Sequence, residues 1–260
     1  MQLHSFFNSS TSYRVRIALA LKGLPFDIVP VNLRKQEQRA ADYVAQNPSA
    51  GVPLLTEGDF QLSQSLAIID YLDATHPEPR LIPAAPRDRA RVLELANAIA
   101  CDIHPVNNMR ILRYLQEELG ATEAQKNAWY HHWIREGLTA VETLLVRHGQ
   151  GAYCFGDAPT LADCCLVPQV ANAQRMGCDL SAYPRPATNR TTSSDFARFP
   201  GPGARYPGRA AARIHRPGLP PAVRQPGRGA RQHRPPGRRD RAPDGRARHV
   251  REGRRALQAR

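Results

Sequence analysis

Four hydroxyl side chains in succession, Ser9–Ser12, stand where a short apolar segment gives way to a helical pattern. A strand-to-helix turn of this kind directs backbone N–H groups and hydroxyls toward one small volume, and the helix dipole adds positive potential there. These donors favour the thiolate form of a bound sulfur over the thiol, so the run predicts a thiolate site. An ordinary helix cap is the alternative, because Ser and Thr cap helices in many proteins.

Two further places offer groups that bind a peptide. Pro53 opens an apolar segment, and a proline in this position is often cis, which turns the backbone of Val52 toward a ligand. A peptide-like ligand then pairs with Val52 as an added strand. Gln64 and Ser65 stand at the next strand-to-helix junction, where an amide, a hydroxyl and a helix N-terminus suit a free carboxylate. The alternatives are an edge-strand proline and a second helix cap.

Polar and ionisable side chains also interrupt a helical stretch at residues 101–112. His104, Asn108 and Arg110 flank Pro105, which ends or kinks a helix. We interpret them as a candidate cluster over the same site, with isolated surface or core groups as the alternative. The chain contains no His, Cys, Asp or Glu cluster with the spacing of metal ligands, so no metal is predicted.

The elements that must position these residues form an α+β layer domain over residues 1–82. The patterns predict strands at 2–7 and 27–33, a helix at 12–22 closed by Gly23, a hairpin of 52–55 with 60–62, and a helix at 65–75. Proline-rich residues 76–86 indicate a linker. Helical patterning then extends from residue 87 to about residue 175, and we assign residues 87–185 to an all-helical domain. Thr160 with Asp163 predicts a capping box at the start of one of its helices.

The formal net charge of +13 is unevenly distributed. Residues 186–260 contain 19 of the 36 Lys and Arg residues, all of them arginine, and 4 of the 23 acidic residues. This segment has 11 prolines, 9 glycines and five aliphatic residues, too few to bury the apolar surface that folding needs. We therefore predict a disordered Arg/Pro/Gly tail over residues 186–260.

Arg-only basicity with Pro, Gly and Ala is also what a GC-rich gene yields when it is read in a shifted frame. We hypothesise that the tail is such a product and that it truncates the helical domain; a locus whose normal frame encodes this tail would contradict the hypothesis. A natural basic tail is the alternative. Nucleic-acid binding is disfavoured, because the tail has no lysine and few aromatic residues that could stack on bases.

The cysteine spacing and the lack of targeting or membrane patterns predict a cytoplasmic protein. The five cysteines lack the spacing of a disulfide framework, which is typical of reduced thiols. The N-terminus has no signal-peptide pattern, and no apolar run reaches the roughly 18–20 residues of a membrane helix.

Residues 8–23 resemble the active-site opening of zeta-class glutathione transferases, the class that includes maleylacetoacetate isomerase and bacterial maleylpyruvate isomerase. The resemblance extends through the segments 47–53, 64–72, 155–163 and 166–175. It covers nearly all of residues 1–185 and ends where the composition changes. It implies a thioredoxin-like domain, an all-α helical bundle domain, glutathione as cofactor and a homodimer.

The resemblance also implies roles for individual residues. Ser9 would stabilise the glutathione thiolate, with Ser10 and Thr11 completing the catalytic loop. Arg110 and Arg175 would hold a dicarboxylate substrate, because guanidinium groups pair well with carboxylates. The implied glutathione-binding set is Ser9, Ser10, Thr11, Arg14, Gln38, Val52, Pro53, Gln64, Ser65, His104, Asn108 and Arg110.

Two positions depart from the pattern. Thr11 stands where the common Ser-Ser-Cys loop has its cysteine, as in the maleylpyruvate isomerase branch. Asn8 stands where an arginine is often found, so one substrate-binding charge is absent.

The resemblance implies the glutathione-dependent cis–trans isomerisation of maleylacetoacetate to fumarylacetoacetate, in aromatic amino-acid breakdown. The thiolate adds reversibly to the cis double bond, the resulting single bond rotates, and elimination gives the trans product. A maleylpyruvate isomerase, a general glutathione transferase and an inactive remnant of the fold remain alternatives.

Overall fold

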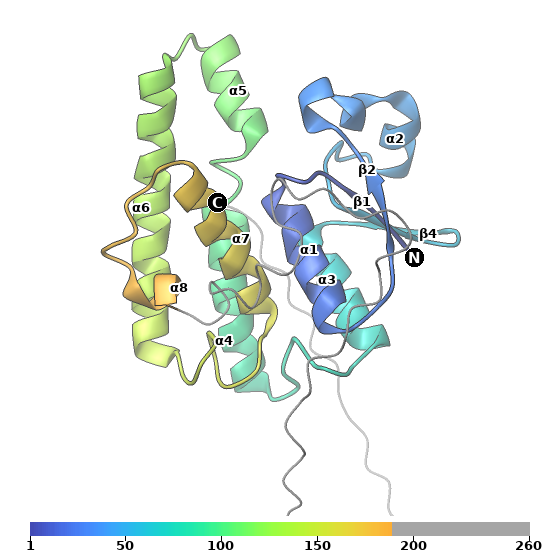
Figure 1. Cartoon of the computed structure of the whole chain (residues 1–260), viewed down its shortest axis with the longest axis vertical. Helices are drawn as coiled ribbons and strands as arrows, with labels where there is room; N and C mark the ends of the chain where they lie inside the picture. The colour runs from blue at the N-terminus through green and yellow to red at the C-terminus, as the bar shows by residue number, and fades with distance from the viewer. Residues whose placement is uncertain (189–260) are drawn as a thin grey trace, which may run out of the picture. The chain divides into compact units, whose positions relative to one another are not determined.

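The computed structural model describes residues 1–188 (Figure 1). Its N-terminal part is built on one sheet with the strand order β2-β1-β3-β4. The strand β1 pairs in parallel with β2 and antiparallel with β3, which forms a hairpin with β4. The strands are β1 (Gln2–Ser5), β2 (Asp27–Pro30), β3 (Leu54–Glu57) and β4 (Phe60–Ser63).

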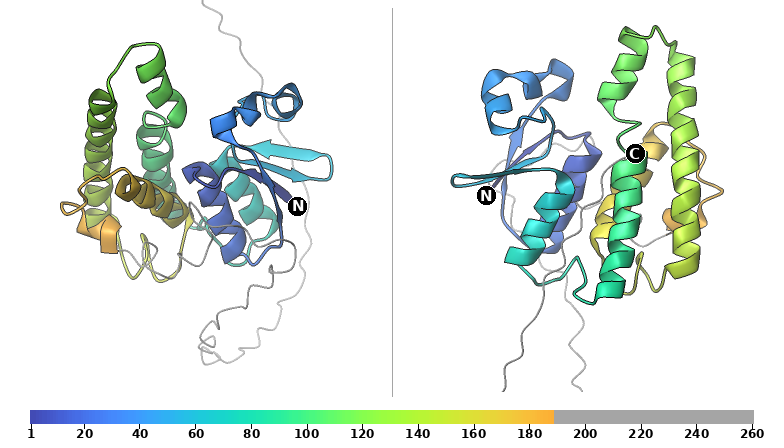
Figure 2. Two further views of the ribbon diagram at one scale, coloured as in Figure 1. Left: turned by 45° about the horizontal axis from the view of Figure 1, so that its top comes forward. Right: turned by 180° about the vertical axis from the view of Figure 1, so that it is seen from behind.

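In this part α1 joins β1 to β2, α2 lies between β2 and β3, and α3 follows β4. Figures 1 and 2 show α1 and α3 side by side, between the sheet and the helix α7. The bounds are α1 (Ser10–Leu21), α2 (Ala41–Gln46), α3 (Ser65–Thr75) and the 3-10 turns η1 (Leu33–Lys35) and η2 (Glu37–Arg39).

The second part is helical, and one long helix, α6, packs against a π-helical segment, η3. The elements are α4 (Pro86–Asn97), η3 (Ala98–Ile103), α5 (Met109–Glu117), α6 (Glu123–His148), α7 (Leu161–Arg175) and α8 (Pro184–Thr188). The predicted α+β fold class with a following helical bundle is therefore confirmed.

Several predicted bounds needed correction. The strands predicted at residues 2–7 and 27–33 end earlier, at Ser5 and Pro30, where the chain turns toward α1 and η1. The first helix begins at Ser10, because Ser9 is its N-cap. The helix at 65–75 and the capping box of Thr160 with Asp163 are confirmed. The hairpin is present, but its first strand, predicted at 52–55, lies at Leu54–Glu57. The tail prediction falls outside the described residues except for its first three positions, which belong to α8.

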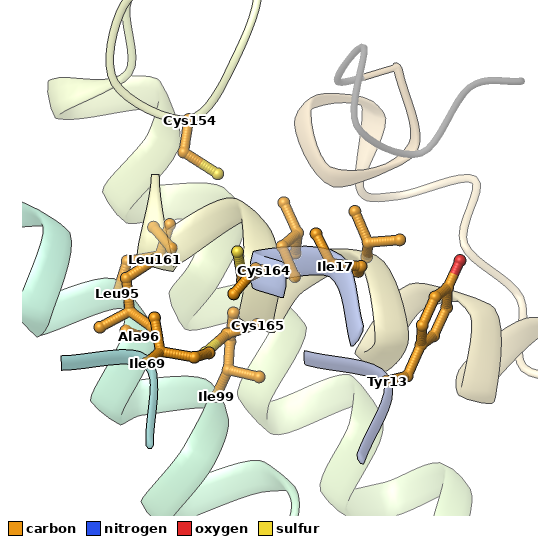
Figure 3. Close-up of a cluster of buried hydrophobic side chains, with 14 of the residues drawn as sticks. Tyr13, Ile17, Ile69, Leu95, Ala96, Ile99, Cys154, Leu161, Cys164 and Cys165 are labelled. Carbon is orange, nitrogen blue, oxygen red and sulfur yellow. The ribbon is translucent and has the colours of Figure 1, made fainter. Parts of the chain in front are cut away.

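One apolar core joins the two parts (Figure 3). Ile17 of α1 and Ile69 of α3 are fully buried, and so are Leu95 of α4, Cys164 of α7 and its neighbour Cys165. Both adjacent cysteines therefore pack inside, and none of the five cysteines, all of which lie among the described residues, is in a disulfide. The contact between α1 and α7 fixes the N-terminus of α1 relative to the helical part.

A buried ion pair anchors the connection between the parts. Lys22 Nζ lies 2.8 Å from Asp73 Oδ1, and both side chains are almost fully buried. The Asp73 carboxylate also accepts from the backbone N–H groups of Leu81 and Ile82 at 2.7 and 3.0 Å. Residues 76–82 are thus tied to the end of α3. No helix in the described part of the chain is long and apolar enough to cross a membrane.

Candidate functional site

The sheet brings three distant segments to one edge. The register pairs His4 with Leu54 and Leu54 with Ser63. The strands β1 and β4 therefore end at the edge where β3 begins. Flanking this edge are the predicted site segments 9–11, 52–53 and 64–65.

Ser9 caps α1. Its backbone is extended, and its Oγ accepts from Ser12 N at 3.1 Å. Ser9 Oγ also lies 2.8 Å from Thr11 Oγ1. Capping, the alternative to a thiolate site, leaves Ser9 at the positive end of the helix. The two interpretations are thus compatible in this fold.

Thr11 joins the helix start to the peptide-binding segment. Its hydroxyl donates to the carbonyl oxygen of Val52 at 2.8 Å. The Val52–Pro53 peptide bond is cis, as predicted. Two supporting residues were not predicted: Tyr43 Oη and Asn47 Nδ2 both donate to the carbonyl of Gly51, at 2.6 and 2.7 Å. No local pattern marks Tyr43 for this role, because the contact depends on the fold.

Arg14 links α1 to the start of α3. Its Nη1 donates to Ser65 Oγ at 3.3 Å, and both residues are buried. Arg14 Nε and Nη2 have no hydrogen-bond partner within residues 1–188. A buried guanidinium without a carboxylate partner favours an anion nearby. Gln64, the exposed N-cap residue of α3, has a left-handed backbone with φ 73°.

The helical part contributes a second cluster, which follows η3. Asn108 caps α5 by accepting from Arg110 N at 3.1 Å, and its Nδ2 lies 3.3 Å from His104 Nε2. Since an amide nitrogen only donates, the imidazole accepts at Nε2. Burial lowers the pKa of His104 to about 3, and the charges of Arg14 and Arg110 contribute to the shift. His104 is therefore neutral at physiological pH, and both arginines lie close enough to affect it.

Arg175 connects the end of α7 to the loop before Ser9. Its Nη1 donates to Asn8 Oδ1 at 2.9 Å, and its Nη2 donates to Asn172 Oδ1. From the sequence, Asn8 is predicted only as a position that lacks a substrate-binding charge. In the fold Asn8 holds Arg175 near the start of α1, which no sequence pattern could indicate.

Gln38 lies apart from these links. It follows β2 in η2, is nearly buried, and its Oε1 has no hydrogen-bond partner among the described residues. No hydrogen bond joins Gln38 to the other predicted site residues in that part of the chain. The described residues also contain no group of three or more His, Cys, Asp or Glu side chains that could hold a metal.

These groups suit a small thiol peptide with a free carboxylate. The carbonyl of Val52 accepts a peptide N–H, and Ser65 beside Arg14 suits a carboxylate. Ser9 at the N-terminus of α1 suits a thiolate.

Comparison with known proteins agrees with this chemistry. Residues 1–74 match the family model of the glutathione S-transferase N-terminal domain. The chain is 49% identical over 184 residues to a probable maleylacetoacetate isomerase of Vibrio cholerae, a match that spans 70% of this chain and 85% of that protein. The chain belongs to the zeta class of glutathione transferases.

Solved structures of the zeta class agree in fold. The holo structure of a bacterial maleylpyruvate isomerase, described as zeta-class, has a TM-score of 0.73 and 46% identity, and the match covers 79% of this chain and 98% of that one. A maleylacetoacetate isomerase from Methylobacterium extorquens has a TM-score of 0.72 and 35% identity, with 78% and 96% covered. The expected zeta-class fold is thus confirmed, while the roles of individual site residues stay predictions.

Proposed function

We propose that this protein catalyses glutathione-dependent cis–trans isomerisation of a maleyl keto acid, either maleylacetoacetate or maleylpyruvate. The observation that carries the proposal is the hydrogen-bonded group of Ser9, Thr11 and Val52 at the N-terminus of α1, in a zeta-class chain. The group places a hydroxyl for a thiolate beside a carbonyl for a peptide N–H.

Glutathione fits the residues present. A related maleylacetoacetate isomerase was solved with glutathione and malonate bound. In this chain the Val52 backbone would hold the central peptide unit, and Gln64 with Ser65 would hold the γ-glutamyl carboxylate near the buried charge of Arg14. Gln38, whose Oε1 is buried and unpartnered within residues 1–188, is a further candidate contact.

Individual side chains of this protein have separate roles in the proposed reaction. Bound glutathione supplies a thiolate nucleophile that adds reversibly to the cis double bond. Ser9 and the α1 N-terminus keep that sulfur ionised. Arg110 and Arg175 hold the carboxylates of the substrate and stabilise the negative charge that develops beside the double bond. Because His104 is neutral, it adds no charge to the site and can donate or accept a hydrogen bond.

Two finer features belong to the same proposal. We infer a homodimer in the cytoplasm, acting in aromatic amino-acid or aromatic-acid breakdown. Light scattering behind size-exclusion chromatography tests the dimer: twice the chain mass of 28.9 kDa is expected, and a monomer at micromolar concentration contradicts it.

The test of the function is a direct assay on the full chain. Maleylacetoacetate and maleylpyruvate are offered with and without glutathione, and conjugation of chlorodinitrobenzene is measured in parallel. We expect isomerisation of at least one maleyl acid, strictly dependent on glutathione. Conjugation without any isomerisation would refute the proposal and favour a general transferase.

A further inference from the structure

The hydrogen bonds around Thr11 have a fixed direction. The Val52 carbonyl has no hydrogen, so the 2.8 Å bond between it and Thr11 Oγ1 uses the only hydroxyl hydrogen of Thr11. Thr11 then has no hydrogen left to give to Ser9. In the 2.8 Å bond between the two hydroxyls, Ser9 is therefore the donor and Thr11 the acceptor.

This direction conflicts with the role proposed for Ser9. Ser9 Oγ accepts from Ser12 N, and its single hydrogen is directed at Thr11. A hydroxyl stabilises a thiolate by donating to it. In the arrangement observed, Ser9 has no hydrogen available for a sulfur atom.

A peptide ligand removes the conflict when its N–H reaches Val52. The ligand N–H satisfies the Val52 carbonyl, so this oxygen no longer depends on Thr11 as its donor. Thr11 can then turn its hydrogen to Ser9 Oγ, which keeps the bond between the two hydroxyls but reverses it. The hydrogen of Ser9 is released for the sulfur, and no hydroxyl loses a bond.

We propose that Thr11 is a positioning residue that reverses this hydroxyl chain when a peptide N–H binds Val52, and so makes ionisation of the ligand's sulfur depend on peptide recognition. The inference rests on the proposed function. Two 2.8 Å hydrogen bonds separate Ser9 from Val52, so the residue that carries the thiol must itself lie opposite Val52. The site therefore selects thiol peptides over simple thiols.

The effect can be measured on the bound thiol without turnover. The ultraviolet absorbance of the thiolate is followed against pH at saturating ligand. One ligand is glutathione, and the other is its analogue with an ester oxygen in place of the cysteine N–H. The wild-type protein should ionise glutathione about fivefold more readily than the analogue, which is the effect of roughly one hydrogen bond.

Substitution of Thr11 gives the decisive comparison. Thr11→Val keeps the side-chain shape but removes the hydroxyl, so both ligands should ionise to the same extent. Thr11→Ser keeps the hydroxyl and should restore the difference. Thr143→Val is the matched control, because Thr143 also donates to a backbone carbonyl but lies on α6, outside the site. Equal thermal melting of the variants excludes misfolding.

The outcomes separate this inference from the proposed function. A Thr11→Val protein that still ionises glutathione about fivefold more readily than the ester analogue overturns the relay and leaves the isomerase proposal intact. A wild-type protein that does not ionise bound glutathione at all overturns both.

Discussion

The packing of Gly137 against Ile103 gives a prediction that links the helical core to the site. Gly137 lies in α6, and a Cβ added there would come within 2.5 Å of Ile103 Cδ1 and closer still to its Cγ1. Ile103 is 1% exposed and ends η3, directly before His104. The overlapping atoms therefore cannot move into solvent, and Gly137→Ala must shift either Ile103 or η3.

Two opposing effects set the magnitude. In a helix, Ala is favoured over Gly by about 1 kcal/mol. Overpacking a close-packed core costs roughly 1–3 kcal/mol. Because the overlap involves two buried carbon atoms, we expect the overpacking cost to exceed the gain in helix propensity. The net loss in the free energy of unfolding should be about 1 kcal/mol.

Urea denaturation of wild type, Gly137→Ala, Ile103→Ala and the double variant measures the effect. In the Ile103→Ala background the overlapping atoms are absent, so Gly137→Ala should stabilise the protein by about 1 kcal/mol. Glutathione affinity should fall in Gly137→Ala, since His104 follows the displaced residue. If the single variant Gly137→Ala, with Ile103 unchanged, were more stable than wild type, the reasoning would be refuted.

Two further predictions concern charged groups. Asp73→Ala leaves the buried Lys22 without its carboxylate and should cost about 3–5 kcal/mol of stability, whereas Asp70→Ala, which breaks an exposed pair with Arg89, should show no measurable loss in urea denaturation. Equal losses of stability in Asp73→Ala and Asp70→Ala would contradict this prediction. Because the pKa of His104 is about 3 in the fold and 6.5 when unfolded, its stabilising contribution is complete above pH 6.5 and declines as the pH falls toward 3. Between pH 7 and 5, the free energy of unfolding of the wild type should fall by about 2 kcal/mol more than that of His104→Gln. Parallel curves of unfolding free energy against pH for the two proteins would contradict this prediction.

The sequence predicted those elements whose signals are local. The helix Ser65–Thr75 begins and ends as expected, because its apolar spacing and its flanking turn lie within one short segment. The hairpin of β3 and β4 follows from two short apolar segments around Gly58, whose φ of 61° suits a tight turn. The helix α2 was missed, because its six residues are too few to show a helical period.

The features that the sequence could not predict depend on distant contacts. Helical spacing continues through residues 98–103, so nothing local distinguishes the π-helical turn from an α-helix. The bonds from Thr11 to Val52 and from Arg175 to Asn8 join residues 41 and 167 positions apart. Side-chain types identified the candidates for this site, but only the sheet register and the packing of α7 on α1 bring them together.

The most direct test of the central claim compares Ser9→Ala with wild type in glutathione-dependent isomerisation. Loss of the hydroxyl that stabilises the thiolate should lower kcat/KM by about 100-fold or more. The control Ser181→Ala alters an exposed serine outside the site and should match wild type. Isomerisation by Ser9→Ala at the wild-type rate would contradict the account.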